Sequence, residues 1–239
     1  MALYIFSDAH LGSGSAGSET TKLAKIALLF EQVKKDGDRL VILGDLFDFW
    51  FEYKHVVPKA HYDLLFLLHD LRVRGIQIDY VSGNHDFWMD DFFDKHLRIP
   101  VHRDVFRLEY AGKKLFLCHG DGLAKADGGY RFLKRVLRNP FNIWLYRKLP
   151  PDWAYPLAKW VSGSSREYTS RRDHEFAEDY RKYAVEKLSE GNDLVAIAHL
   201  HIPVYEQYPE GIYINTGDFI HHFSYARIDA DSAQLNFLK

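Results

Sequence analysis

The sequence predicts an α/β protein built from two packed sheets, with an inserted helical cap. Two observations support this prediction. In the first half of the chain, apolar runs typical of buried strands alternate with segments of helical periodicity, which is the pattern of a parallel, layered α/β core. In the second half, short strand-like segments separated by turn residues follow one another, which indicates a second sheet packed on the first.

The elements of the first half can be placed in order along the chain. Strands are expected at residues 3–7, 39–43 and 76–81. The first helix is expected at 20–35, where apolar residues recur at helical spacing: Leu23, Ile26, Ala27, Phe30 and Val33. The second begins at Pro58 and runs to about Arg74, before Gly75, with an apolar side formed by Tyr62, Leu65, Phe66, Leu68 and Leu71.

The second half begins with a hairpin at residues 105–110 and 114–118, around the turn residues Ala111 and Gly112. Short strands are expected at 194–198, 202–208, 212–216, 222–228 and 234–238. The long segment between the hairpin and these strands is helical in pattern and is not needed to close either sheet. We therefore expect one domain over residues 1–239, in which residues 128–190 form an inserted helical cap.

Composition narrows the class of protein. The chain is 47% hydrophobic, which is enough for one sizeable core, and its net charge of −2 does not favour nucleic-acid binding. The single cysteine, Cys118, has no intramolecular partner, so a reduced core thiol is expected. No apolar run approaches the ~20 residues of a membrane span, and the N-terminus reads as a strand rather than a signal sequence, so a cytoplasmic location is expected.

Five short blocks of metal-binding residue types occur along the chain, and nearly all of them end a strand-like apolar run. They read Asp8-Ala9-His10, Gly44-Asp45-Leu46-Phe47-Asp48, Gly83-Asn84-His85-Asp86, His119-Gly120-Asp121 and His199-Leu200-His201. In open α/β folds, the carboxyl ends of the strands form the edge at which chemistry occurs. Each block alone has a simpler explanation, such as a turn, but all five in this order favour a metal site.

The types of ligand in these blocks indicate the metal. They are carboxylates, imidazoles and one amide, without a thiolate, which excludes a structural zinc ribbon and suits Mn²⁺, Fe²⁺ or Zn²⁺. Two divalent ions carry four positive charges, whereas Asp8 and Asp45 supply two negative ones. An anionic substrate, especially a phosphate, would complete the balance. Two ions about 3.5–4 Å apart can generate hydroxide and hold a phosphoryl group for in-line attack.

The five blocks resemble those of the calcineurin-like metallophosphoesterases, whose pattern is D-x-H, G-D-x-x-[DE], G-N-H-[DE], a lone H and G-H-x-H. The resemblance covers nearly the whole chain, with Ala198 standing where the family usually has Gly. It implies a four-layer α/β/β/α sandwich and two ions, with Mn²⁺ expected and Fe or Zn as alternatives. One ion would be held by Asp8, His10, Asp45 and His201, and the other by Asp45, Asn84, His119 and His199. The same resemblance implies two catalytic residues. His85 would lie beside the phosphate, and Asp86 would orient His85.

A closer resemblance is to the UDP-2,3-diacylglucosamine hydrolases of lipid A synthesis. These enzymes split the pyrophosphate of a UDP-linked diacylated sugar into the lipid monophosphate and UMP. The resemblance rests on chain size, on the segments 44–50 and 120–123, on the position of the helical cap, and on the spacing of Asp127 and Tyr130. It implies that Asn84, His85, Asp127 and Tyr130 contact the substrate. One position departs, because the best-known members have Arg where this chain has His85.

The cap has its own composition. Residues 131–160 interleave many aromatic and aliphatic side chains with Arg and Lys, and three of the five Trp of the chain fall there. Basic, aromatic-rich helices bind anionic membrane surfaces, and the same side chains could line an acyl-chain groove. The simpler alternative is a helix pair packed on the core. Ser165, Arg166 and Arg171 follow, and either bind the diphosphate or uridine, or form an exposed charged helix start.

Three alternatives to the lipid pathway hydrolase stay open. A phosphodiesterase or phosphatase with a soluble nucleotide substrate would have the same ligands without needing the aromatic cap. A nuclease is disfavoured because the basic residues concentrate in the cap. A non-catalytic scaffold is disfavoured because such proteins lose ligands, whereas all seven are present here together with His85. A cytoplasmic enzyme that associates peripherally with the inner face of the membrane is therefore expected, and its oligomeric state is left open.

Overall fold

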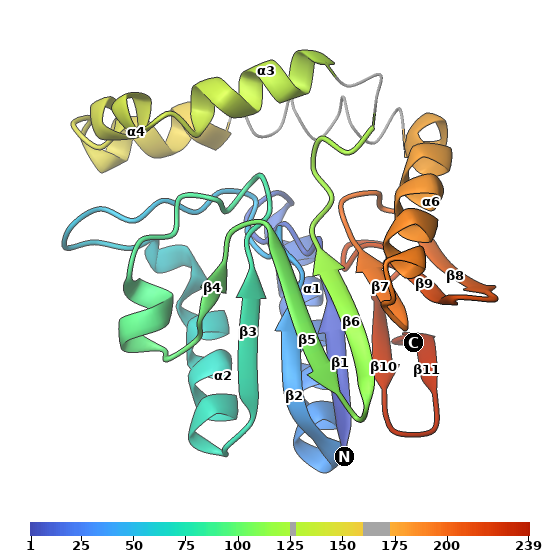
Figure 1. The fold of residues 1–239 in the computed structure, drawn as a ribbon. Helices are drawn as coiled ribbons and strands as arrows, with labels where there is room; N and C mark the ends of the chain where they lie inside the picture. The colour runs from blue at the N-terminus through green and yellow to red at the C-terminus, as the bar shows by residue number, and fades with distance from the viewer. Residues whose placement is uncertain (125–127, 160–172) are drawn as a thin grey trace.

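The computed structural model describes residues 1–124, 128–159 and 173–239 (Figure 1). Its first sheet has the strand order β11-β10-β1-β2-β3-β4. The first-half strands run parallel to one another: β1 Ala2–Phe6, β2 Gly37–Ile42, β3 Gln77–Val81 and β4 Val101–His102. The C-terminal strands β10 Ser224–Ile228 and β11 Ala233–Phe237 extend the sheet in antiparallel fashion. The expected strands are confirmed with small shifts at their ends, while the two-residue β4 was too short to predict.

The second sheet has the order β5-β6-β7-β9-β8. The expected hairpin is β5 Val105–Tyr110 and β6 Lys113–Cys118, and β6 pairs in parallel with β7 Leu194–Ile197. Strands β8 Pro203–Tyr208 and β9 Gly211–Thr216 complete the sheet. Cys118 at the end of β6 is a free, buried thiol, and burial raises its pKa to about 12, as expected for an unreactive core cysteine.

Helices cover both outer faces of the pair of sheets. Helices α1 Ala16–Asp36 and α2 Tyr62–Val73 pack on the first sheet, and α6 Asp173–Ser189 packs on the second. Alternate residues of β1 face opposite ways: Tyr4 and Phe6 pack towards the helices, while Leu3 and Ile5 pack in the apolar layer between the sheets. This arrangement confirms the expected four-layer α/β/β/α fold.

The buried side of α2 differs from the expected one. Leu64, Leu68 and Leu71 are buried, whereas Tyr62 and Phe66 are 68% and 59% exposed. This helix carries apolar side chains on more than one side, so periodicity alone does not predict which side is buried. Packing on the sheet decides it. A one-turn 3₁₀ helix, Lys59–His61, precedes α2, and a π-helical turn, Phe92–His96, follows β3; neither was predicted.

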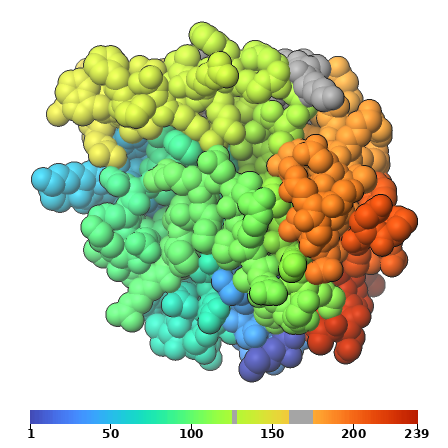
Figure 2. All heavy atoms as spheres, viewed as in Figure 1, coloured from blue at the N-terminus to red at the C-terminus, as the bar shows by residue number. Residues whose placement is uncertain are grey.

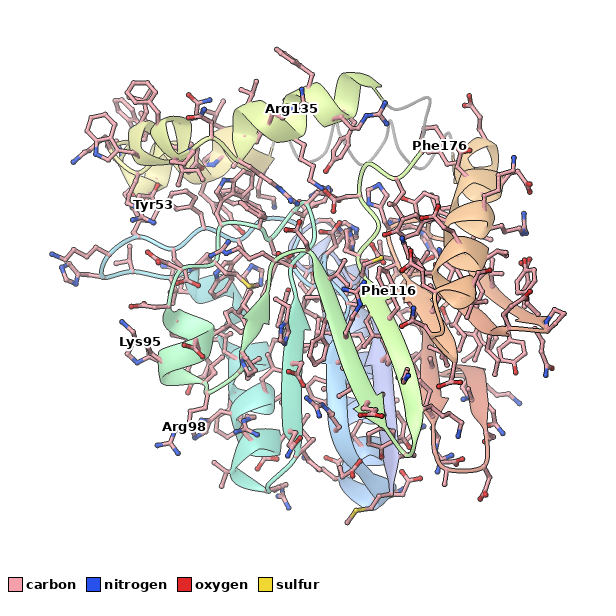
Figure 3. The ribbon with its side chains drawn as sticks, viewed as in Figure 1. Tyr53, Lys95, Arg98, Phe116, Arg135 and Phe176 are labelled. Atoms are coloured by element: carbon pink, nitrogen blue, oxygen red, sulfur yellow. The ribbon has the colours of Figure 1, made fainter. Side chains whose placement is uncertain are left out.

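The cap comprises helix α3 Gly128–Leu137, helix α4 Pro140–Tyr146 and the helical residues 151–159. It lies across the end of the molecule towards which β2, β3 and β6 point, and the space-filling view shows it resting on the body below (Figures 1 and 2). Tyr53 is one of the aromatic side chains that pack beneath α4 (Figure 3).

The expected cap range of 128–190 thus includes two different parts. Phe176, Tyr180, Ala184 and Leu188 of α6 pack against the second sheet, so this helix belongs to the fourth layer. We propose that residues 128–159 form the cap of the described chain. No helix in the described segments is long and apolar enough to cross a membrane.

Candidate metal centre

All seven predicted ligands lie in loops at the carboxyl ends of parallel strands. Asp8 and His10 follow β1, Asp45 follows β2, Asn84 follows β3, His119 follows β6, and His199 and His201 follow β7. Ligand atoms of Asp8, His10 and His201 lie within 4.8 Å of one another, and so do those of Asp45, His119 and His199. The structure therefore brings the sequence-predicted ligands together in two adjoining groups.

The loops that carry these ligands have unusual backbone conformations. Asp8, His10, Asp45 and His199 have φ values of 52°, 42°, 51° and 69°, in a region that non-glycine residues rarely adopt. Main-chain hydrogen bonds hold two of the loops together, from Asp8 N to Gly44 O at 3.1 Å and from His10 N to Asp45 O at 3.0 Å. Concentration of such residues at one place is typical of functional sites.

Two glycines permit the close approach of these loops. A Cβ atom at Gly83 would lie 2.7 Å from the main-chain nitrogen of Asp45 and would overlap its carboxylate. Gly44 has a φ of +90°, and a Cβ there would lie 2.9 Å from Gly83 N. Glycine is thus required at both positions, which explains the Gly that begins the second and third blocks.

Each of the two carboxylates has one oxygen fixed by a main-chain amide. His199 N donates to Asp8 Oδ2 at 3.2 Å, and His85 N donates to Asp45 Oδ1 at 2.9 Å. The other oxygens face the imidazoles: Asp8 Oδ1 lies 3.6 Å from His201 Nε2, and Asp45 Oδ2 lies 3.3 Å from His119 Nε2. Asp45 Oδ2 is also 3.7 Å from His10 Nε2, so Asp45 stands between the two groups.

Unsatisfied polar atoms provide a test of whether these residues fit cations. Asp8 Oδ1 and both ring nitrogens of His10 are buried without a hydrogen-bond partner among the described residues. Burying such atoms unpaired is costly, and a divalent ion would satisfy Asp8 Oδ1 and one ring nitrogen of His10. His119 Nδ1 lies 2.9 Å from Leu43 O and donates to it, which leaves Nε2 as the lone-pair nitrogen that faces Asp45 and Asn84. The donor set therefore fits two divalent cations.

The electrostatics of the group agree with this fit. Burial lowers the pKa of His10 and of His199 to about 4, so both imidazoles are neutral and can act as ligands near pH 7. Burial would also lower the pKa of His119, but the adjacent Asp45 carboxylate raises it to about 10. In the absence of a metal, a proton on His119 thus balances part of the negative charge, and cation binding would displace it.

The two predicted catalytic residues have different surroundings. His85 is buried, with Nδ1 2.9 Å from the main-chain oxygen of Asp48 and Nε2 4.0 Å from Asp45 Oδ2. The Asp86 carboxylate accepts hydrogen bonds from Gly83 N at 2.7 Å, Leu46 N at 2.9 Å and the Tyr80 hydroxyl at 2.5 Å. Asp86 therefore ties two ligand loops together, and burial raises its pKa to about 6.

Two carboxylates near the centre were not predicted as site residues. A ligand atom of Asp48 lies within 4.8 Å of ligand atoms of His10 and His85. Asp48 ends the second sequence block, so its position there was the available signal. Asp121, in the fourth block, accepts a hydrogen bond from the Tyr130 hydroxyl at 2.9 Å.

The predicted substrate residues are placed only in part. The Tyr130 ring lies 6.2 Å from the ring of His199, at the edge of the metal centre. Asn84 and His85 lie within the centre itself. The remaining predicted contacts, Asp127, Ser165, Arg166 and Arg171, lie outside the described residues.

A cavity of about 390 Å³ leads from the metal centre beneath the cap. At one end it is lined by Asp48, Asn84 and His85. Its walls are mainly apolar side chains from the cap and from the loops below: Phe49, Phe51, Phe87, Trp88, Leu133, Val136, Leu137, Ile143, Tyr146, Leu157 and Ala158. The cavity joins a polar end that suits phosphate to an apolar part that suits hydrocarbon.

The comparisons with known proteins agree with this geometry. A family model described as calcineurin-like phosphoesterase matches residues 1–213. A UDP-2,3-diacylglucosamine hydrolase from Porphyromonas gingivalis is 33% identical over 74% of this chain and 71% of that protein. Its namesake from Haemophilus influenzae is 26% identical over 99% and 98% of the two chains. A crystal structure of a hypothetical protein from Pyrococcus horikoshii shares the fold, with a TM-score of 0.54, 11% identity, and 100% and 87% coverage. The chain belongs to the calcineurin-like phosphoesterase family.

Proposed function

We propose that this chain hydrolyses the pyrophosphate bond of a UDP-linked diacylated glucosamine, giving the lipid monophosphate and UMP. The observation that carries the proposal is the mainly apolar cavity that leads from the metal centre beneath the cap. A soluble phosphodiester would not need this space. The names of the two relatives above support the same substrate class.

The proposed chemistry uses the two groups of ligands. Asp8, His10, Asp45 and His201 would hold one divalent ion, and Asp45, Asn84, His119 and His199 the other. When bound, the ions supply a hydroxide and neutralise charge on the phosphoryl group. We propose Mn²⁺ as the metal, with Fe and Zn as alternatives that the same ligand types accept. His85, at the polar end of the cavity, would contact the phosphoryl group or protonate the departing oxygen.

The inner face of the cap is proposed to bind acyl chains. Leu133, Leu137 and Ile143 line the cavity from the cap, opposite Phe51 and Trp88 of the body. Each methylene buried there would contribute about 0.8 kcal/mol. Even partial burial of two acyl chains would therefore dominate the affinity for a diacylated substrate.

The outer face of the cap is proposed to rest on an anionic membrane. Phe132 and Trp153 are 69% and 75% exposed, and Phe141 and Trp144 also face solvent. Exposed aromatic side chains near Arg and Lys are typical of surfaces that insert into the headgroup layer. This arrangement would place the enzyme peripherally on the membrane that supplies its lipid substrate.

An assay of the Mn²⁺-loaded protein tests the function. We expect hydrolysis of detergent-dispersed UDP-2,3-diacylglucosamine with a kcat/KM far above that for bis(p-nitrophenyl) phosphate. Leu137→Glu, which places a charge in the cavity, should raise the KM for the diacylated substrate at least about tenfold. Leu145→Glu, at an exposed cap position outside the cavity lining, is the matched control. Preference for the small diester, or equal effects of both variants, would contradict the proposal.

A further inference from the structure

Lys134 of helix α3 and Arg138, the residue after this helix, both contact a single carboxylate beside the metal centre. Lys134 Nζ lies 2.7 Å from Asp121 Oδ2, and Arg138 Nη2 lies 3.1 Å from the same oxygen. Arg138 N donates to Lys134 O at 2.9 Å, which continues the helical turn and places the two side chains, four residues apart, on the same side. Arg135 lies between them in sequence and is exposed (Figure 3). Asp121 follows the ligand His119 by two residues, so these cations lie close to the proposed metals.

The guanidinium of Arg138 is held at a defined place. Its central carbon lies 3.9 Å from the centroid of the Phe87 ring, and Nη2 is 3.5 Å from Gly83 O, next to the ligand Asn84. Such stacking orients an Arg side chain without neutralising it. The other terminal nitrogen, Nη1, is 3.7 Å from the carboxylate of Asp104, which is 80% exposed and therefore well screened by water.

Asp121 is the carboxylate that both cations contact, and Asp104 lies farther from Arg138. Two half-buried cations share the carboxylate of Asp121, whose side chain is 8% exposed, and the exposed Asp104 contributes little. Lys134 and Arg138 both line the cavity together with Asn84 and His85. One ion pair with Asp121 would be enough to hold the cap in place. The second cation lies at the cavity wall, where its positive charge faces the substrate space.

We propose that Lys134 and Arg138 form a second anion site that holds the departing phosphate of a diphosphate while the metal centre holds the phosphate under attack. This inference rests on the proposed function, since it assumes a phosphoester substrate. In the step concerned, a water releases one proton to solvent, and the resulting hydroxide oxygen adds to the phosphorus under attack. The bond from that phosphorus to the bridging oxygen breaks, and its electron pair stays on the departing phosphate. The two cations stabilise the negative charge that develops there.

The site accounts for selection of a diphosphate over a simple diester. A monophosphate diester would engage the metal centre alone, whereas a diphosphate reaches both sites. The cations are thus specificity determinants, and their loss should reduce the advantage of the second phosphate.

Competitive inhibition of the Mn²⁺-loaded protein tests this assignment. The probes are UDP-glucose, a soluble diphosphate diester, and UMP, which carries the same nucleoside on one phosphate. The wild type should bind UDP-glucose at least about tenfold more tightly than UMP. Arg138→Gln and Lys134→Gln should each bring this ratio close to one. Arg138→Lys, which keeps the charge but not the planar fork, should give an intermediate ratio. Arg135→Gln, on the same helix, should keep the wild-type ratio.

A wild-type ratio of one, or variants that lower the affinities for UDP-glucose and UMP equally, would overturn the inference. The two cations would then serve only to hold the cap on the body. Metal content and thermal unfolding of each variant exclude loss of the fold; if Arg138→Gln does not fold, Arg138→Lys and Lys134→Gln still decide. Failure of the proposed function is recognised separately, as absence of hydrolysis of the diacylated substrate by the wild type.

Discussion

Among single residues, Asp45 is the one whose carboxylate lies between the two ligand groups. One of its oxygens accepts from His85 N, and the other faces His119 and His10 across the boundary between the two ligand groups. Asp45→Asn should therefore remove both ions, whereas His201→Ala, which touches one group, should remove one. Elemental analysis of metal-reconstituted protein measures this directly. Two ions retained in a folded Asp45→Asn variant would show that the carboxylate does not bridge.

His85 allows a second prediction at this scale. It lies beside the metal ligands and lines the polar end of the cavity. His85→Ala should lower kcat about 10²–10⁴-fold while metal content stays intact, because the side chain is proposed to act on the substrate. His85→Arg should restore part of the rate if contact with the phosphoryl group is the main role. Normal turnover of His85→Ala would assign the residue a structural role.

Single residues were predictable where chemistry and position coincided. The seven candidate ligands, which the structure brings together, stood out because Asp, Asn and His at strand ends have few other uses in such numbers. The hydrogen bonds of Asp86, the proximity of Asp48 to His85 and the cations around Asp121 depend on how separate loops meet. Sequence spacing does not contain that information.

Helix α1 shows how an element supports the centre. Its buried face includes Lys22, whose ammonium donates to Ala9 O at 3.1 Å and His10 O at 2.8 Å and pairs with Glu19 at 2.7 Å. Glu19 in turn accepts from the main-chain nitrogens of Gly12 and Gly14 at 2.7 Å. The first turns of α1 thus fix the loop that carries His10.

Lys22→Met should destabilise the metal-free protein by about 3 kcal/mol, because it removes a buried cation from Glu19 and a donor from the carbonyls of Ala9 and His10. Urea unfolding in the presence of a chelator measures the loss. Lys34→Met on the same helix, which removes surface pairs with Glu31 and Asp70, should cost at most about 1 kcal/mol. Equal losses in the two variants would mean that Lys22 has no special role.

Elements were predicted better than the faces they bury. Strand ends and helix limits follow from turn residues and apolar runs, and most were placed correctly. The buried lysine of α1 and the exposed Tyr62 and Phe66 of α2 were not predicted. Hydropathy depends on residue type alone and does not include the groups that a side chain contacts in the folded protein.

At the scale of the whole molecule, the layers were predictable and the extent of the cap was less so. Parallel pairing and a second run of short strands determine a two-sheet core. Both the cap and α6 read as helical insertions in sequence, and the apolar face that α6 buries on the second sheet distinguishes them.

The position of the cap predicts which surface of the molecule contacts a membrane. Trp153→Glu should reduce binding to vesicles containing anionic lipid about tenfold, because it places a charge on the proposed contact face. Phe66→Glu changes a similarly exposed aromatic residue on α2, outside the cap, and should leave binding unchanged. Co-sedimentation with vesicles provides the measurement. Equal losses, or no loss in either variant, would remove the cap from the proposed contact.

The proposed ligands Asp8 and His201 lie far apart in the sequence, and β1 pairs with both β2 and β10. On the ribosome, the first residues of the centre are therefore made long before their partners. An ion cannot be captured by the full set until His201 has emerged and β7 has joined its sheet. Loading of the complete proposed ligand set would thus follow synthesis of β7 and His201, and occupancy of the centre would report that these distant segments have come together.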